Sequence, residues 1–367
     1  MIRTVEELRA IIRDDAVVNR KAAFGSFELT SRCNLNCRMC YICNPVKPVG
    51  AELIGEQWLD IMRQARDAGL IYAMLTGGEP LLHRDFWDIY LGLRKLGVYI
   101  TLNSNGTTIT PEVADRLKEY PPLLVQISLY GSSPKAYEKV TGSASGYEKA
   151  IQGVQLLKER GFNISLRTIL TEDTAEDMVN MVPLILSYGG RFNYVNYILP
   201  PIHDNANDSC ALRLDGNELV RYTKVIMDAV KTYYETNKGS LERTNIEKIT
   251  TSGSPIESER EEVLLESTQF GCGAGTIRFG ITYDGFIRSC ELSRHPAFNL
   301  RDMTFSEGIE KLGQAIANVK YCAECADCTL RSKCTICPMQ HYIESGDFNK
   351  KADYICEYVK TGIKIFE

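Results

Sequence analysis

The sequence has 367 residues, of which 44% are hydrophobic and 24% are charged, and its formal net charge is −5. This size and composition predict a folded, enzyme-sized protein with one large domain, a smaller second domain and an ordinary hydrophobic core. The mildly acidic charge, without a block of lysine and arginine, argues against a nucleic-acid partner. Because there is no long apolar run and no signal-peptide core, we expect a cytoplasmic protein without a membrane span.

The segment 1–24 mixes charged residues with short apolar spacing, which predicts an amphipathic helical extension. Between residues 25 and 235, short β-rich runs alternate with longer segments of helical period. The predicted strands cover residues 26–30, 70–75, 98–102, 123–129, 163–170 and 192–199. Six such βα units with right-handed crossovers require parallel strands, which form a partial barrel or an open doubly wound sheet.

Unusual sequences follow the first four predicted strands. They are TSRCNLNCRMC, TGGEP, NSNGT and YGSS, in chain order. Because the carboxyl ends of parallel strands meet at one edge, these sequences predict a single shared active site.

The second half of the chain changes character after about residue 235. Residues 236–270 are charged and irregular, and we interpret them as a linker with room for one helix. Segment 271–367 is rich in cysteine and has few long periodic helices. We therefore expect metal, rather than a large apolar core, to organise this second domain.

The chain has 13 cysteines, too many to explain as disulfides in a reducing compartment, so metal binding is the leading interpretation. Cys33, Cys37 and Cys40 form a C-x3-C-x2-C group, whereas structural zinc sites use four paired ligands. Three thiolates suit three irons of a cubic cluster and leave the fourth iron open to a reactant. A zinc knuckle is the alternative. We interpret the nearby Cys43 as a buried thiol and not a ligand.

CNLNCRMC, TGGEP at 76–80 and NSNG at 103–106 together resemble the radical SAM enzyme superfamily. The resemblance implies that Cys33, Cys37 and Cys40 hold a 4Fe-4S cluster whose open iron is chelated by S-adenosylmethionine. In that family an electron from the cluster cleaves this cofactor to a 5'-deoxyadenosyl radical, which abstracts hydrogen. The cofactor-binding residues that the resemblance implies are Gly77, Gly78, Glu79, Ser104, Ser128, Arg167 and Ile198. Arg167 is also interpretable as a structural ion-pair residue.

The C-terminal cysteines resemble a SPASM domain, which carries auxiliary iron-sulfur clusters. The pattern implies a proximal cluster on Cys272, Cys290 and Cys337, and a distal cluster on Cys325, Cys328, Cys334 and Cys356. Cys322 is an additional thiol: either it completes the proximal cluster, or that cluster keeps an open iron. A zinc ribbon is the alternative. The resemblance thus implies an α/β fold, with a partial (β/α)6 TIM-like barrel followed by a small α+β domain.

The resemblance implies a radical SAM enzyme. It also implies a peptide substrate, because members of this family with SPASM domains act mainly on peptides. We therefore expect a maturase that forms a thioether or carbon-carbon crosslink, or an oxidised residue, in a ribosomally made peptide. The alternatives are formylglycine formation of the sulfatase-maturase type, a step in small-molecule cofactor or tetrapyrrole synthesis, and a non-catalytic zinc protein. Glu291 and Tyr130 are the candidate catalytic residues. A loop acid and a core aromatic are the simpler interpretations of these two side chains.

The expected partners are a peptide substrate with a leader segment and an external electron donor such as flavodoxin or ferredoxin. About 25 residues precede the first predicted strand, which leaves no room for an appended peptide-recognition domain. We therefore expect a leader peptide to bind on the barrel, on the SPASM domain, or through a separate protein.

Overall fold

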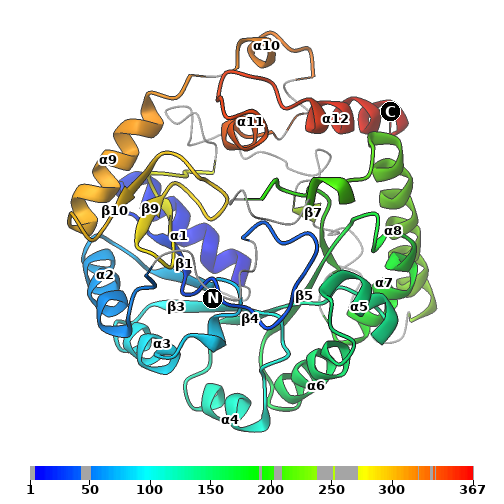
Figure 1. Ribbon diagram of the computed structural model, residues 1–367, viewed down its shortest axis with the longest axis horizontal. Coiled ribbons are helices and arrows are strands. Elements are labelled where there is room, and N and C mark those ends of the chain that lie inside the picture. The colour runs from blue at the N-terminus through cyan, green and yellow to red at the C-terminus, as the bar shows by residue number, and fades with distance from the viewer. Residues whose placement is uncertain are drawn as a thin grey trace.

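A computed structural model describes residues 5–42, 51–189, 192–201, 209–237, 251–252, 272–320, 322–330, 334 and 336–366. At its centre, six strands run parallel in the order in which they occur in the chain, with helices around them (Figure 1). They are β1 Phe24–Glu28, β2 Tyr72–Thr76, β3 Tyr99–Ser104, β4 Leu124–Ser128, β5 Ile164–Ile169 and β6 Asn193–Val195. The predicted parallel α/β partial barrel is confirmed.

The helices that alternate with these strands follow the predicted periodic segments. They are α1 Val5–Asn19, α2 Gly55–Asp67, α3 Phe86–Lys95, α4 Pro111–Glu119, α5 Pro134–Thr141, α6 Gly146–Glu159, α7 Met178–Ser187 and α8 Gly216–Thr236. Short 3₁₀ turns lie at η1 Pro80–Leu82, η2 Ala175–Asp177 and η3 Ser209–Leu212. Local sequence sets several boundaries: Ser133 caps the start of α5, and Gly142, with φ of 70°, ends it.

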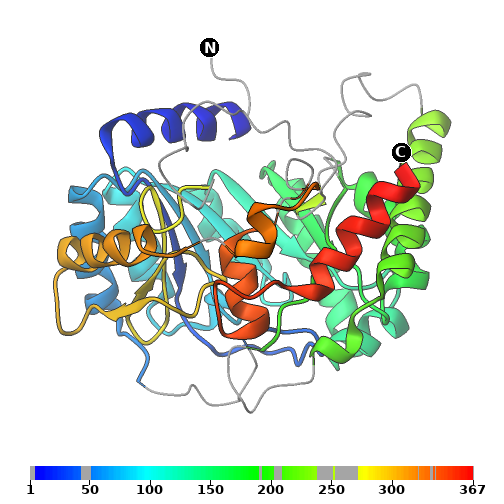
Figure 2. The ribbon, with the colours of Figure 1, turned by 90° about the horizontal axis from the view of Figure 1, so that it is seen from above.

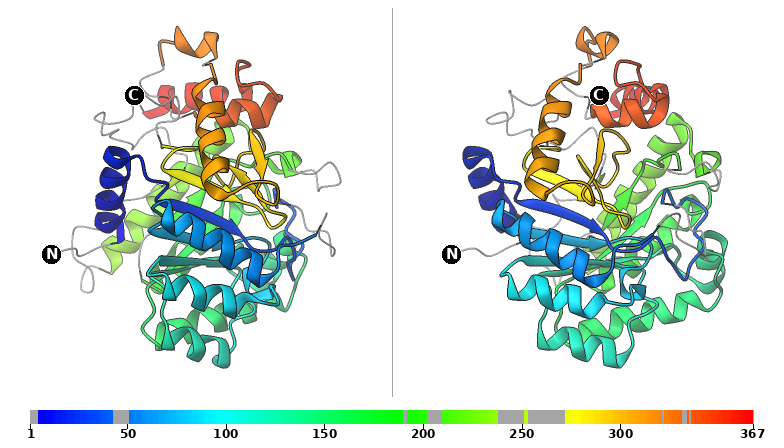
Figure 3. Two further views of the ribbon diagram at one scale, coloured as in Figure 1. Left: turned by 90° about the vertical axis from the view of Figure 1, so that its left-hand side faces the viewer. Right: turned by 60° about the vertical axis from the view of Figure 1, so that its left-hand side comes forward.

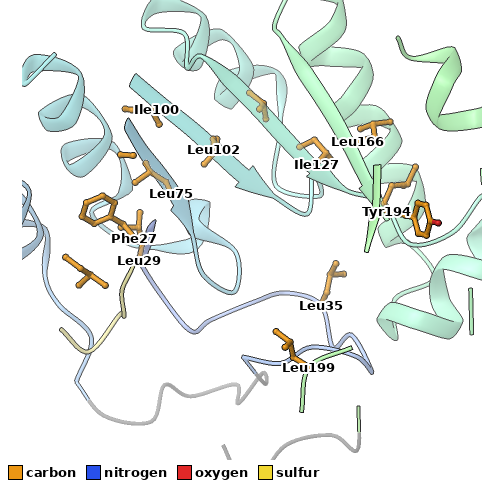
Figure 4. Packing of buried hydrophobic residues seen from close by; sticks show 14 of the residues in the cluster. Phe27, Leu29, Leu35, Leu75, Ile100, Leu102, Ile127, Leu166, Tyr194 and Leu199 are labelled. Atoms are coloured by element: carbon orange, nitrogen blue, oxygen red, sulfur yellow. The ribbon is translucent and has the colours of Figure 1, made fainter. Parts of the chain in front are cut away.

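The barrel strands alternate between an apolar outer face and a polar inner face. Phe27 packs against Trp58 of α2, and it shares its buried layer with Leu75, Leu102 and Ile127 (Figure 4). The intervening strand residues carry polar groups that pair with each other. For example, Asn193 Nδ2 donates to Ser165 Oγ at 3.2 Å, and Asn103 Nδ2 lies 3.2 Å from Met74 Sδ. The inner face of the barrel, which we call the lumen, is therefore polar.

The two ends of the barrel differ. The helix α1 lies at one end, where Arg9 donates a hydrogen bond to the hydroxyl of Tyr72. The loop that follows β1 lies at the opposite end (Figure 2). Since β1 runs from the first end to the second, the carboxyl ends of the parallel strands surround this loop.

The chain after residue 271 continues the same sheet. β8 Arg278–Ile281 pairs parallel with β1, and β9 Phe286–Arg288 and β10 Ala297–Asn299 extend it antiparallel. Thr282 and Asp284 build the β8–β9 turn, in which Gly285 has a φ of 95°. The predicted second domain is therefore joined to the barrel through β1.

Helices are more prominent in this region than the sequence analysis predicted. They are α9 Phe305–Ala317, α10 Ala323–Ala326, α11 Pro338–Ser345 and α12 Asp353–Phe366. Two of them pack against the barrel: α9 lies beside α2, and α12 lies along α8 (Figure 3). Most of the predicted linker 236–270 lies outside the described residues. Within it, β7 Thr251–Ser252 pairs parallel with β6. None of the described helices is long and apolar enough to cross a membrane.

Candidate functional site

The cysteine loop, residues 29–42, carries Cys33, Cys37 and Cys40 at the carboxyl end of the barrel. All three thiols are partly buried, and none of the twelve cysteines that the structure describes is in a disulfide. Burial raises the pKa of Cys37 well above its ordinary value, and the nearby charges of Cys40 and Cys33 raise it further. The three sulfurs therefore share one small region, in which a bound cationic centre would compensate their charge. Cys43 lies outside the described residues.

Two hydrogen bonds fix the cysteine loop on the end of α5. Asn36 N–H donates to the carbonyl of Thr141 at 2.9 Å, and Arg38 N–H donates to the carbonyl of Val140 at 3.0 Å. The Arg38 guanidinium also pairs with Asp173, which follows β5. The loop is thus held by elements on the far side of the barrel from β1, and its thiols have a defined place.

Gly77 and Gly78 lie where the ends of β1 and β2 approach each other most closely. Gly78 N–H donates to the Thr30 carbonyl at 2.8 Å, and Glu79 N–H donates to the Arg32 carbonyl at 2.7 Å. A Cβ at Gly77 would lie 2.4 Å from the Thr30 carbonyl oxygen, and one at Gly78 would lie 2.2 Å from that of Arg32. Both positions therefore require glycine, because the start of the cysteine loop packs directly on them.

The Glu79 carboxylate is fully buried and collects several donors. Ser104 Oγ lies 3.0 and 3.1 Å from its two oxygens, Asn105 N–H donates to Oε2 at 2.8 Å, and Leu81 N–H donates to Oε1 at 3.3 Å. Burial raises the pKa of Glu79 to about 7, although these hydrogen bonds lower it. A ligand ammonium at this carboxylate would replace the lost solvation. Ser104, predicted to contact the cofactor, is seen here holding Glu79.

Asn105 is a site residue that the sequence analysis did not single out. Its Nδ2 donates to Asn34 Oδ1 at 2.9 Å and lies 3.7 Å from Cys33 Sγ. Thr107 donates to Asn105 Oδ1 through both its amide and its hydroxyl. Asn105 therefore links the end of β3 to the first cysteine. The NSNG turn signals the bond of Asn105 Oδ1 with the Thr107 backbone, but not the reach of its Nδ2 to Asn34.

Ser128, Tyr130 and Arg167 lie on the lumen side of β4 and β5. Tyr130 is hydrogen-bonded to Ser128, and its pKa is raised by burial and by the nearby charge of Cys37. Gln126 accepts from Arg167 Nε and Nη1 at 2.7 and 2.8 Å in the amide orientation that satisfies both groups. The lumen thus brings these three predicted residues to the same side as the cysteine loop.

Ile198 and Met39 pack together beside the cysteine loop. Both are buried, in a small apolar cluster with Val140 and Leu212, and Tyr130 packs against it. Met39 occupies the position where radical SAM enzymes often have an aromatic residue. The cluster gives this side of the loop an apolar surface of the kind that an adenine ring requires.

Glu291 is exposed and directly follows Cys290. Burial raises the pKa of Tyr41, and the charge of Glu291 raises it further. The same carboxylate acts on Arg167, opposing the lowering of its pKa by burial. Glu291 therefore lies near Tyr41 and Arg167.

The C-terminal cysteines lie in two places. We call Cys272, Cys290 and Cys337 the proximal thiol group, because the pKa of Cys290 is raised by burial and by the charges of Glu291, Cys337 and Cys272. Its first and last members lie 65 residues apart in the sequence. The group adjoins Glu291, whose charge also acts on Tyr41 beside Cys40.

The distal thiol group comprises Cys325, Cys328, Cys334 and Cys356, and these four side chains line one cavity together with Lys351 and Lys360. Burial raises the pKa of Cys325 to about 12, with a further rise from a hydrogen bond and the charge of Cys322. Cys322 therefore lies beside the distal group. Its position does not favour the interpretation that it completes the proximal group.

In the part of the chain that the structure describes, no three His, Cys, Asp or Glu side chains converge on a point as ligands of a single metal ion. An iron-sulfur cluster does not need such convergence, because each iron takes its own thiolate. The shared region of Cys33, Cys37 and Cys40 and the four-thiol distal cavity fit clusters in this respect.

Residues 27–185 match the family model of the radical SAM superfamily. The chain carries a radical SAM domain. Such a domain implies a 4Fe-4S cluster and S-adenosylmethionine, and the three cysteines of the loop, with Gly77 to Glu79 beside them, are the residues here that fit this pair.

Curated relatives of the chain fall into two groups. An AdoMet-dependent heme synthase of Methanosarcina barkeri (strain Fusaro / DSM 804) is 21% identical over 345 residues, which are 91% of this chain and 95% of the relative. A PqqA peptide cyclase of Streptomyces rochei is 33% identical over 164 residues, which are 44% of each protein. The similarity to the heme synthase thus extends over most of the chain, whereas the similarity to the peptide cyclase covers less than half of it.

The solved structure of Streptococcus suis SuiB bound to S-adenosylmethionine has the same fold. Its TM-score is 0.72 at 18% identity, and the match covers 97% of this chain and 84% of SuiB. The fold shared with SuiB therefore includes the region after residue 271 as well as the radical SAM domain.

Proposed function

We propose that this protein is a radical SAM peptide maturase that carries out a net oxidation, forming a crosslink or an oxidised residue in a ribosomally made peptide. When bound, the cluster and S-adenosylmethionine would supply a 5'-deoxyadenosyl radical that removes a hydrogen atom from the substrate. Cys33, Cys37 and Cys40 would hold the cluster, and Glu79 would receive the ammonium of the cofactor.

The observation that carries the proposal is the position of the proximal thiol group relative to the cysteine loop. Glu291 follows Cys290 of the proximal group, and its charge acts on Tyr41, the neighbour of Cys40. A substrate in the lumen would lie between two sets of thiols. After hydrogen abstraction, bond formation in the substrate releases one electron and one proton, and auxiliary clusters on the proximal and distal groups would accept the electron.

The remaining predicted residues would line the space around cofactor and substrate. Ser104 would act through Glu79, which it holds by hydrogen bonds, while Ser128 and Arg167 would face the carboxylate or ribose of the cofactor. Ile198 would offer the apolar contact for adenine. Glu291 and Tyr130 would face the substrate, with Glu291 placed to accept the proton that leaves it.

A peptide substrate is supported by the fold. SuiB shares the fold over 97% of this chain, and it has also been solved bound to its precursor peptide SuiA. We infer that the substrate here is a peptide with a leader segment, and that flavodoxin or ferredoxin supplies the electron for cofactor cleavage.

A second candidate function is a radical step on a tetrapyrrole. It is favoured by the match to AdoMet-dependent heme synthase over 95% of that protein's length. The two candidates need the same cysteine loop and differ in what fills the lumen.

One assay separates the two candidates. The anaerobically reconstituted protein is incubated with dithionite and S-adenosylmethionine, and 5'-deoxyadenosine is measured with no addition, with a peptide encoded beside the gene, and with a porphyrin. We expect the peptide to increase the yield and to lose two hydrogens in its mass. An increase with the porphyrin alone would replace the peptide proposal with the second candidate, and no 5'-deoxyadenosine at all would exclude both. Cys37→Ser is the matched inactive control.

A further inference from the structure

His341 of α11 is fully buried and faces the distal thiol group. Its Nε2 lies 3.6 Å from Cys325 Sγ, and its Nδ1 accepts the backbone N–H of Ala352 at 3.0 Å. Because Nδ1 is the acceptor, the neutral ring carries its proton on Nε2. A ring protonated on both nitrogens would turn a donor toward Ala352 N–H. The fold thus presets a His341 N–H directed at the sulfur of Cys325.

Cys322 supplies a second contact to the same sulfur. Its side chain is completely buried and is hydrogen-bonded to Cys325. The main chain fixes this geometry, since Cys325 N–H donates to the Cys322 carbonyl at 3.0 Å at the start of α10. The hydrogen bond between the two side chains raises the pKa of Cys325, so it does not stabilise the thiolate. The His341 N–H is the donor that the fold directs at this sulfur.

The surroundings of the distal cavity are also suited to negative charge. Lys351 and Lys360 line it, and none of the residues that line it in the described part of the chain is acidic. Lys351 in turn pairs with Glu324 and Asp353, each at 3.2 Å, which holds it at the rim.

We propose that His341 is a positioning residue that donates a hydrogen bond to the Cys325 thiolate and so raises the reduction potential of a distal iron-sulfur cluster. A hydrogen bond withdraws electron density from a ligand sulfur, which stabilises the reduced cluster. The hydrogen bond would thus make the distal cluster a better electron acceptor than it would be without His341. The inference rests on the auxiliary clusters of the proposed function.

The test is an EPR-monitored redox titration of the reconstituted full chain. His341→Leu removes the N–H donor at similar volume, and we expect one cluster potential to become more negative while the others and the iron content stay unchanged. His341→Gln offers an amide N–H and an acceptor oxygen, and should restore part of the shift. His295→Leu is the matched control, since His295 is exposed and stacks on Tyr342, and should leave all potentials unchanged. Unchanged potentials in His341→Leu would overturn the inference.

Cys322→Ala tests whether Cys322 is a ligand. We expect it to keep all iron and sulfide, whereas the loss of one cluster of iron would make Cys322 a ligand and overturn the distal set of Cys325, Cys328, Cys334 and Cys356. Cys328→Ala should lose one cluster of iron. If it loses none, the distal cluster of the proposed function is wrong, which is a different failure from unchanged potentials in the His341 variants.

A wild-type measurement covers the case in which the variants do not assemble. The chain has four histidines, so ¹⁵N-histidine labelling is selective. Pulsed EPR of the reduced protein should show one weakly coupled histidine nitrogen that persists in His295→Leu. Its absence from the wild type would overturn the inference.

Discussion

Replacing Gly78 with alanine tests how the end of β2 holds the cysteine loop. The new Cβ would lie 2.2 Å from the Arg32 carbonyl oxygen and 2.7 Å from that of Ser31. Both are backbone atoms, so a change of side-chain rotamer cannot relieve the clash. Relief requires the two strand ends to separate by about 1 Å, which breaks the 2.7 Å bond from Glu79 N–H to Arg32. Overpacking costs about 1–3 kcal/mol and the lost hydrogen bond about 1 kcal/mol. We expect Gly78→Ala to lower the unfolding free energy by about 3 kcal/mol.

The assay is anaerobic urea unfolding of the metal-free protein, followed by iron analysis of reconstituted samples. Gly78→Ala should also bind less iron, because the start of the cysteine loop moves. Gly313→Ala is the control, since its Cβ would meet only the Gly275 carbonyl oxygen at 3.5 Å within α9, and it should be neutral or stabilising by about 1 kcal/mol. Wild-type stability together with full iron binding in Gly78→Ala would refute this account of the glycine.

Three further predictions concern other contacts of the site. Burial raises the pKa of Glu79 from 4.5 to about 7. The contribution of this group to the stability of the metal-free protein is therefore fully present below pH 4.5, and about 3 kcal/mol is lost as the pH rises through 7. Glu79→Gln should flatten this part of a curve of stability against pH, and an unchanged slope would contradict the prediction. Asn105→Ala removes the amide beside Cys33, and iron release to a chelator should show an affinity lower by about 10- to 100-fold; an unchanged release curve would count against a role for Asn105. Arg213 and Glu344 pair at 2.6 Å with side chains 13% and 12% exposed. Arg213→Met should cost about 3 kcal/mol in urea unfolding, because it removes the cation from a carboxylate that then keeps only a neutral donor, the Tyr197 hydroxyl, in the described part of the chain. The double variant with Glu344→Gln should recover most of that loss, and equal stability of single and double variants would contradict the pairing.

Local patterns in the sequence were sufficient to predict the barrel. The strand segments are short apolar runs that alternate with segments of helical period. Each of these signals can be recognised within a short window of the sequence. The unusual strand-end sequences were likewise placed correctly at one edge, because parallel βα units fix where strand ends meet.

Long-range pairings were not predictable in this way. The parallel pairing of β8 with β1 joins residues about 250 positions apart, and nothing in Arg278–Ile281 identifies its neighbour. The same holds for α12, whose apolar face is covered by α8 and not by its own segment. Sequence alone therefore suggested a more separate second domain than the structure contains.

Within the site, residue types predicted ligands better than supporting contacts. The cysteine spacing predicts Cys33, Cys37 and Cys40 as ligands, which stays a prediction, and the structure places the three thiols in one loop. Asn105 carries no such restriction, because an asparagine in a turn usually hydrogen-bonds its own backbone. Cys322, in contrast, precedes Cys325 by three positions at the start of α10, so its place beside the distal group follows from local structure.

The central claim is that the cysteine loop leaves one iron of its cluster open to S-adenosylmethionine. The most direct test is EPR of the reduced, anaerobically reconstituted protein with and without this cofactor, compared with the Cys33→Ala/Cys37→Ala/Cys40→Ala variant. We predict that the cofactor alters the spectrum of one cluster in the wild type and of none in the variant. Zinc in the loop, or a wild-type spectrum that does not respond to S-adenosylmethionine, would contradict the account.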